Sequence, residues 1–291
     1  MNTITTGCLI VGLLLSLCAG AAPPAPLKVV AAENFYGGVV RQIGGDRVAV
    51  TDILNDPDQD PHLFEAAPSV ARALAQAALV VYNGAGYDSW FAKLLGGGSA
   101  TRRVINVAEL TGVEPGANPH IWYDPRTMIR LARELAASFR TRDPDHAGDY
   151  DRRLQGFVKD MGTLEKQIHA MRASYQGAPI TATEPVFGYM ARALGLKMRN
   201  VGFQMAIMNG TEPSASQVAA FEDDLRNREV RAVIYNVQAA YGTTARLREL
   251  AGSMSIPVVG VTELQPQGKT YVEWMLGQLN SLARALQSAD Q

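Results

Sequence analysis

The feature that most constrains the fold is an alternation of short β-rich runs and helical patterns that occurs twice along the chain. The first series consists of strand-like runs at residues 27–32, 48–54 and 79–82, a helix at 35–43, and a helix opened by Pro68 and its expected N-cap Ser69. The second series consists of strand-like runs at residues 180–183 and 232–236, a helix at about 186–194, and a helix opened by Pro213 and Ser214. Strands that alternate with helices predict βαβ units and mostly parallel sheets. We therefore predict an α/β fold of two similar lobes; chance likeness between two unrelated α/β stretches is the alternative.

A highly charged segment, residues 143–176, separates the two series. Its apolar residues are spaced by three and four: Leu154, Phe157, Met161, Leu164, Ile168 and Met171. This spacing predicts an amphipathic helix of about 25–30 residues, roughly 40 Å long. A helix of that length would act as a rigid brace for both lobes, whereas a coiled-coil arm would need sustained heptads, which are missing here.

The first residues have the composition of a targeting segment. Residues 8–18 form an apolar run that is too short to span a bilayer, and Ala19-Gly20-Ala21 follows as a small-x-small cleavage pattern. We expect cleavage after Ala21 and export to the periplasm. A short N-terminal anchor and a lipid on Cys18 are alternatives, but Leu17 is not the small residue that lipid processing prefers. The expected organisation is a signal peptide at 1–21, an N-terminal lobe at 22–142, a bracing helix at 143–176 and a C-terminal lobe at 177–291.

The charge balance restricts the partners. The 27 Lys and Arg residues and 28 Asp and Glu residues leave a net charge of -1, in a chain that is 47% hydrophobic. Such a balance argues against nucleic acid or an anionic membrane surface as the partner.

Two of the four histidines share one local pattern. His62 lies in DPHLFE (residues 60–65) and His120 in NPHIWYDP (residues 118–125). Proline restricts the backbone before each imidazole, so each ring is held on a stiff turn, which suits a metal ligand. The neighbouring carboxylates Asp60, Glu65 and Asp124 are candidates to orient the rings by hydrogen bonds. The other histidines, His146 and His169, lie in the charged segment and are expected at the surface.

Two carboxylates in the second half are candidates to complete a site. Glu184 and Glu263 each follow a strand-like apolar run. Open parallel sheets bind ligands at the carboxyl ends of their strands, where both glutamates are expected. Each glutamate by itself is better explained as a helix cap or a surface carboxylate.

The order of four motifs resembles the cluster A-I metal receptors of bacterial ABC importers. The motifs are DPHLFE, YNGAGYDSW (residues 82–90), NPHIWYDP and TEPVFGYMARALGL (residues 183–196). The resemblance extends from Lys28 to about Leu286. It implies two lobes joined by a rigid helix, with one ion bound between them by four side chains.

Carried over motif by motif, the resemblance implies that His62, His120, Glu184 and Glu263 are the metal ligands. Glu184 stands where relatives carry His or Glu, and Glu263 departs from their usual Asp. Asn236 stands near a position that is often acidic in relatives. The implied cargo is one divalent ion, delivered to an ABC transporter permease by a monomeric binding protein.

The donor types favour Mn²⁺ or Fe²⁺, and the Irving–Williams order keeps Zn²⁺ close behind. A metal-dependent hydrolase with an open coordination position, or a surface adhesin, is the alternative. Because the chain has no H-E-x-x-H, G-x-S-x-G or P-loop motif, we expect a binding protein and not an enzyme.

Overall fold

Both halves of the chain build a parallel four-stranded sheet with the same topology. The computed structural model describes residues 25–57, 59, 61, 64–96, 101–239 and 242–289. The first sheet has the order β2-β1-β3-β4 and the second the order β6-β5-β7-β8, with every pair parallel. The first-sheet strands are β1 (Leu27–Glu33), β2 (Val48–Leu54), β3 (Leu79–Tyr82) and β4 (Arg103–Asn106). The second-sheet strands are β5 (Pro179–Ala182), β6 (Lys197–Arg199), β7 (Val233–Asn236) and β8 (Val258–Val261). The predicted α/β fold of two similar lobes is confirmed.

Helices connect the strands within each lobe, as βαβ units require. The first lobe contains α1 (Asn34–Gly44), α2 (Pro68–Gln76), α3 (Ser89–Leu95) and α4 (Val107–Thr111). The second contains α7 (Gly188–Ala193), α8 (Val201–Met208), α9 (Ala215–Arg226) and α10 (Gly242–Ser253). Among the described residues, no helix has the length and apolar character needed to cross a membrane.

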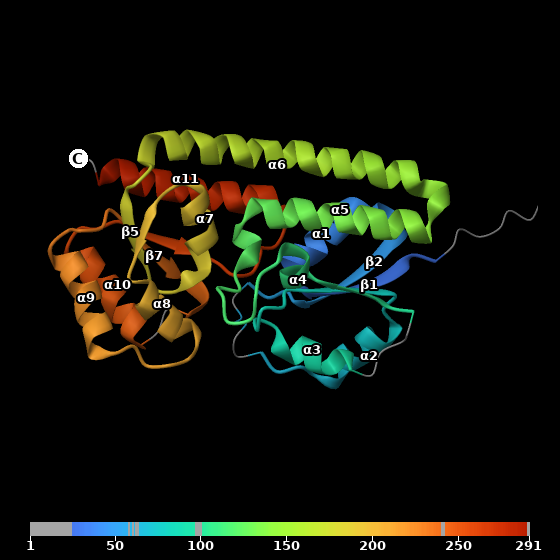
Figure 1. Ribbon diagram of the computed structural model, residues 1–291, viewed down its shortest axis with the longest axis horizontal. Helices are drawn as coiled ribbons and strands as arrows, with labels where there is room; N and C mark the ends of the chain where they lie inside the picture. Colours follow the sequence, from blue (N-terminus) through green and yellow to red (C-terminus); the bar gives the residue numbers. More distant parts are fainter. Residues whose placement is uncertain are drawn as a thin grey trace, which may run out of the picture.

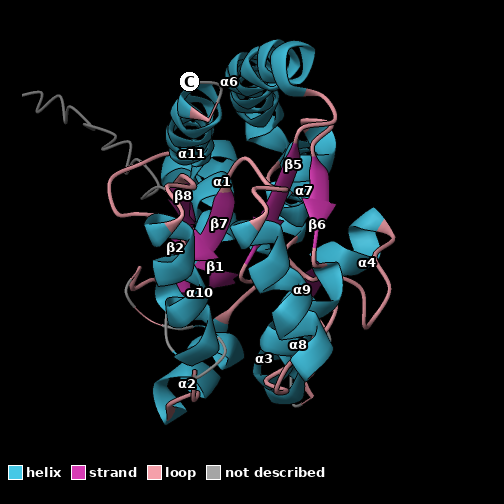
Figure 2. Ribbon diagram, turned by 90° about the vertical axis from the view of Figure 1, so that its left-hand side faces the viewer, coloured by secondary structure: helices cyan, strands magenta, loops and turns pink. Residues whose placement is uncertain are grey.

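The long helices α5 (Pro125–Arg142), α6 (Ala147–Tyr175) and α11 (Tyr271–Ser288) lie above the two sheets. Figure 1 shows that α6 extends over both lobes, with α11 beside it, and Figure 2 shows the same pair from the end. The apolar stripe of α6 is buried at Phe157, Met161, Leu164, Ile168 and Met171, as the spacing predicts. The long connecting helix is thus confirmed, while the residue limits expected for the lobes stay a prediction.

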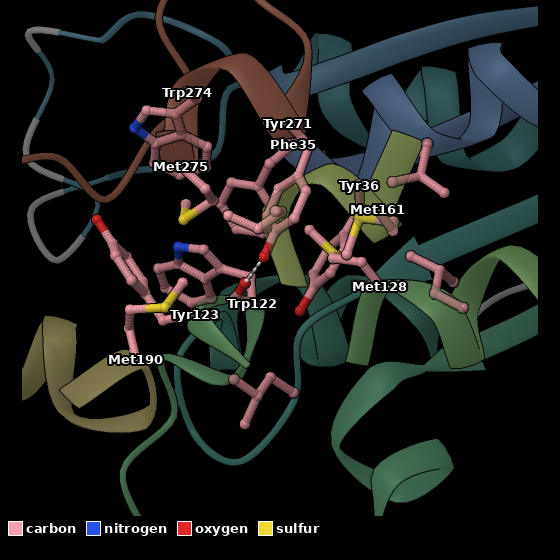
Figure 3. Close-up of a cluster of buried hydrophobic side chains, with 14 of the residues drawn as sticks. Phe35, Tyr36, Trp122, Tyr123, Met128, Met161, Met190, Tyr271, Trp274 and Met275 are labelled. Carbon is pink, nitrogen blue, oxygen red and sulfur yellow. Dashed lines mark hydrogen bonds between the residues drawn. The ribbon is translucent and has the colours of Figure 1, made fainter. Parts of the chain in front are cut away.

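One hydrophobic core connects the two lobes. Phe35 from α1 stacks on Trp122 at 4.6 Å between ring centroids, and Tyr123 packs against Phe187 of the second lobe at 5.8 Å. Tyr271 of α11 donates a hydrogen bond to the carbonyl oxygen of Trp122 at 2.6 Å. Figure 3 shows the rings of Phe35, Trp122, Tyr123 and Tyr271 together with the methionines that lie around them. This core contains residues of both lobes, and its Trp122 packs against the candidate ligand His120.

One predicted helix start is wrong. Ser69 was expected to cap its helix, but α2 begins at Pro68 and Ala67 is the N-cap residue. Proline suits the first helical position because its φ is already helical and its missing N–H needs no partner there. In the second lobe Ser214 is the N-cap, and it forms a capping box with Gln217. The two Pro-Ser pairs are therefore not equivalent.

Candidate metal centre

The strand order of each sheet reverses at its first strand, because the chain first moves to one side of that strand and then to the other. Parallel sheets with such a reversal bind ligands at the carboxyl ends of the two neighbouring strands, which in the second sheet are β5 and β7. Glu184 follows β5, Asn236 ends β7, and Glu263 follows β8 at the adjacent strand end. His120 lies between α4 and α5 in the first lobe. His120 and Glu263 are fully buried, and Glu184 is 5% exposed.

Asn118 fixes the imidazole of His120. Asn118 Oδ1 lies 2.7 Å from His120 Nδ1 and accepts a hydrogen bond from the His120 backbone N–H at 3.1 Å. Asn118 Nδ2 donates to the carbonyl oxygen of Pro185 at 2.7 Å, so the orientation of the amide is determined. Nδ1 of the ring must therefore carry the proton, which leaves the lone pair of the ring on Nε2.

The neighbouring residues hold the same turn in place. Asn83 Nδ2 donates to the carbonyl oxygen of Pro119 at 2.9 Å, and Tyr36 donates its hydroxyl proton to Asn83 Oδ1 at 2.6 Å. The ring of His120 packs edge-on against Trp122 and Tyr87, at 5.1 and 5.9 Å between centroids. The ring has little freedom left to lose when it binds a ligand.

Of the carboxylates expected to orient the histidines, Asp124 does not do so. The side chain of Asp124 instead accepts from the N–H of Arg126 at 3.0 Å, which caps α5, and pairs with the Arg126 guanidinium. Glu65 is exposed. Asp60 and the candidate ligand His62 both lie outside the described residues.

Glu263 faces His120 across the lobe boundary. Glu263 Oε2 lies 3.6 Å from His120 Nε2 and accepts a hydrogen bond from the Tyr87 hydroxyl at 2.8 Å. Two ligand atoms about 2.1 Å from one tetrahedral ion lie about 3.4 Å apart. The separation of these two atoms is therefore close to that of neighbouring ligands on one metal ion.

Asn236 connects Glu263 to Glu184. Its Nδ2 donates to Glu184 Oε2 at 2.6 Å and to Glu263 Oε1 at 2.5 Å, so these two oxygens lie within about 5 Å of each other. Gln238 supports the arrangement, since its Oε1 accepts from the N–H of Glu263 at 2.6 Å and its Nε2 donates to the carbonyl oxygen of Gln59 at 2.8 Å. The structure thus places His120 beside Glu263 and connects Glu263 to Glu184 through the Asn236 amide.

More acidic groups lie deeper in the first lobe. Glu33, at the end of β1, is fully buried, and burial together with the charge of Asp88 raises its pKa well above the usual value. Burial also raises the pKa of Asp88 to about 6, although the N–H groups of Asn83 and Gly84 donate to its carboxylate at 2.6 and 2.8 Å. Burial raises the pKa of Tyr87 as well, so its hydroxyl remains a donor to Glu263.

The described part of the chain does not by itself complete a site. Among its residues, no three His, Cys, Asp or Glu side chains gather closely enough to hold a metal ion. The imidazole and carboxylate groups that are present are of the types that bind divalent transition metals.

The prediction that His146 and His169 lie at the surface is confirmed in part. His169 is exposed, while His146 is half-buried and pairs with Asp143 at 2.7 Å.

Sequence reasoning did not predict the hydrogen bonds that three residues make around the candidate ligands. Asn118 stands in the second prolyl-histidine motif and Tyr87 in the YNGAGYDSW motif, so both carried a signal. Asn236 ends a strand in the same way as Asn83 does in the first half. Tyr87 and Asn236 bond partners that are distant in the sequence, which local patterns do not reveal. Asn118 bonds both the neighbouring His120 and the distant Pro185.

A fold of two parallel-sheet lobes around a buried imidazole and two carboxylates defines a two-lobed binding protein. Residues 29–285 match the family described as zinc-uptake complex component A, periplasmic (ZnuA), and the chain belongs to this family. The predicted family is confirmed, and so is the expectation of a binding protein and not an enzyme. The family is one of exported importer components, which work outside the cytoplasm with a membrane permease.

Curated relatives are similar over most of their length. The manganese ABC transporter substrate-binding lipoprotein PsaA of Streptococcus mitis is 23% identical over 303 residues, which cover 94% of this chain and 95% of the relative. The manganese-binding lipoprotein MntA of Halalkalibacterium halodurans is 25% identical over 273 residues, covering 89% and 88% of the two chains.

Solved structures share the fold. The periplasmic zinc-binding protein TroA of Treponema pallidum superimposes with a TM-score of 0.76 at 19% identity, covering 90% of this chain and 99% of TroA. The binding protein FpvC of Pseudomonas aeruginosa, solved in complex with Mn²⁺, gives a TM-score of 0.74 at 20% identity, covering 91% and 99%.

Proposed function

We propose that this protein binds one divalent transition-metal ion between its lobes, through His62, His120, Glu184 and Glu263, and delivers it to the permease of an ABC importer. The observation that carries the proposal is the buried pair of His120 Nε2 and Glu263 Oε2, 3.6 Å apart across the lobe boundary. An imidazole and a carboxylate buried at ligand spacing suit a cation whose charge offsets the desolvation of the carboxylate. In this proposal residues 22–142 and 177–291 form the two sides of the cleft, and residues 143–176 brace them.

The cargo is Mn²⁺, Fe²⁺ or Zn²⁺. Relatives named for manganese and solved relatives named for zinc support this range. Two carboxylate ligands favour Mn²⁺ or Fe²⁺ by donor type, while Zn²⁺ binds tightly to almost any such set. Hydrolysis would need a coordination position open to substrate, and four protein ligands around one tetrahedral ion would close it.

The test is metal binding by purified protein with single ligands removed. We expect elemental analysis to find about one divalent ion per chain. We expect His62→Ala and His120→Ala each to weaken binding at least tenfold, about 1.4 kcal/mol. His169→Ala is the matched control, because His169 is exposed on α6. If the two ligand variants titrate metal as the parent and the control do, the proposed site is wrong.

We further propose that the mature protein is a periplasmic monomer beginning near Ala22, without a lipid on Cys18. N-terminal sequencing and the mass of the exported protein test the processing site, and light scattering tests the oligomeric state. An intact Met1 or a lipid-modified Cys18 would contradict the proposed processing.

A further inference from the structure

Asn34 joins the first lobe to the loop that carries Glu263. Its Nδ2 donates a hydrogen bond to the carbonyl oxygen of Gln265 at 2.8 Å, and its Oδ1 accepts from the backbone N–H of the same residue at 3.0 Å. These two bonds fix the orientation of the amide, because a flipped amide would set donor against donor and acceptor against acceptor. A side chain of the first lobe thus holds the backbone two residues beyond a candidate ligand of the second lobe.

The backbone of Asn34 is held firmly by its neighbours. Asn34 is the first residue of α1, and the two residues that follow it, Phe35 and Tyr36, are fully buried in the core that contains residues of both lobes (Figure 3). Phe35 stacks on Trp122, and the Tyr36 hydroxyl donates to Asn83 Oδ1. Close packing around both rings leaves the start of α1 little freedom to move, so the Asn34 amide offers the loop a fixed donor and a fixed acceptor.

The second lobe holds the same loop from its own side. Gln238 Oε1 accepts from the backbone N–H groups of Glu263 and Leu264, at 2.6 and 3.3 Å. Asn34 takes the next N–H along the chain, that of Gln265, so one side chain from each half of the protein binds this stretch of backbone. The stretch lies outside any helix or strand, and these bonds from distant residues replace those that regular secondary structure would supply.

We infer that Asn34 is a positioning residue for the metal centre, because it sets the distance between the Glu263 carboxylate and the His120 imidazole. This inference rests on the proposed function. Glu263 Oε2 and His120 Nε2 lie 3.6 Å apart, close to the separation of two ligand atoms on one ion. A binding site needs its ligands held within about 0.5 Å of the productive geometry, and a loop without regular structure does not supply that precision by itself. The two bonds from Asn34 supply the missing restraint on the side of the first lobe.

The first experiment is a double-mutant cycle read as Zn²⁺ affinity in competition titrations at fixed pH. We expect Asn34→Ala to weaken Zn²⁺ binding about tenfold, because Glu263 is then held less precisely. In a Glu263→Gln background, where a neutral amide replaces the carboxylate ligand, the same change should weaken the remaining binding by less than about twofold. Asn106→Ala is the matched control, since it also removes an asparagine whose side chain accepts two backbone hydrogen bonds, and it should leave the affinity unchanged. Equal losses from Asn34→Ala in both backgrounds would mean that Asn34 does not act through Glu263, and the inference would be overturned.

The second experiment uses the unaltered protein and so does not depend on a variant that folds. Amide hydrogen exchange of the metal-free protein, followed by NMR, should show a protected N–H at Gln265, because that group is bonded to Asn34 Oδ1. A Gln265 amide that exchanges as fast as that of the exposed Gly268 would mean that Asn34 does not hold the loop, and the inference would fail. Failure of the proposed function would look different: the parent would bind no metal, although its Gln265 amide would still be protected.

Discussion

Asn118 offers the sharpest test of how the structure prepares the site. Its amide orients the ring of His120 through Oδ1, at 2.7 Å from Nδ1, and reaches the second lobe through Nδ2, at 2.7 Å from the Pro185 carbonyl oxygen. Pro185 follows the candidate ligand Glu184 directly. One side chain therefore positions a ligand of the first lobe relative to a ligand of the second.

Asn118→Ala removes three hydrogen bonds: two with His120 and one with Pro185. At about 1 kcal/mol each, the metal-free protein should lose about 3 kcal/mol of unfolding free energy. For a chain of this size the midpoint of thermal unfolding should fall by roughly 5 °C. Loss of a residue that orients a metal ligand typically weakens binding about 10- to 100-fold, or about 1.4–2.7 kcal/mol.

Asn118→Asp separates the contribution of Asn118 to metal affinity from its contribution to folding stability. Aspartate keeps an oxygen acceptor for His120 Nδ1 but cannot donate to the Pro185 carbonyl oxygen. We expect its metal affinity to stay within about tenfold of the parent, while its unfolding midpoint falls. Competition with a fluorescent chelator and thermal unfolding in excess chelator measure the two quantities. If folded Asn118→Ala binds metal as tightly as the parent, the orienting role of Asn118 is refuted.

Three further outcomes are expected. Glu184→His exchanges an anionic oxygen donor for a neutral nitrogen, so the ratio of Zn²⁺ to Mn²⁺ affinity should rise at least tenfold; an unchanged ratio would place Glu184 outside the coordination shell. Because burial raises the pKa of Asp88 to about 6 in the folded protein, its stabilising contribution is full below about pH 4 and is lost as the pH rises through about 6. Unfolding free energies of the metal-free protein between pH 4 and 7 should show this decline, and Asp88→Asn should reduce it; an identical pH profile in the variant would contradict the raised pKa. Removing bound metal with a chelator should lower the midpoint of thermal unfolding, and the drop should be larger when the starting sample contained more metal. A midpoint that does not change with metal concentration would argue against a metal site in the folded protein.

Local patterns were sufficient to predict the architecture. Strands β1 and β7 come from apolar runs, and α6 from the regular spacing of Phe157, Met161 and Leu164. These signals are local because a strand repeats every two residues and a helix every 3.6. The positions of Glu184 and Glu263 at strand ends followed from the same patterns, since a parallel sheet brings its carboxyl ends to one edge.

Local patterns failed where two nearby groups compete for one role. Asp124 and Asn118 both lie within a few residues of His120, and sequence spacing gave no reason to prefer the amide. The folded chain directs Asp124 to the first turn of α5, where it caps the helix, and Asn118 to the ring. Ser69 was misplaced for a similar reason, because the preceding Pro68 already fits the first helical position.

The sequence by itself determined the elements, the family and the candidate ligands, because periodicity, prolines and short motifs act over a few residues. Only the tertiary structure decided which groups surround those ligands. The Tyr87 hydroxyl reaches Glu263 across 176 positions of the chain, and the Asn236 amide reaches Glu184 across 52. The contact of Tyr87 depends on how the two lobes pack, and the contact of Asn236 depends on the pairing of β7 with β5. Both are tertiary arrangements, so the hydrogen bonds around the proposed metal centre have no local sequence pattern.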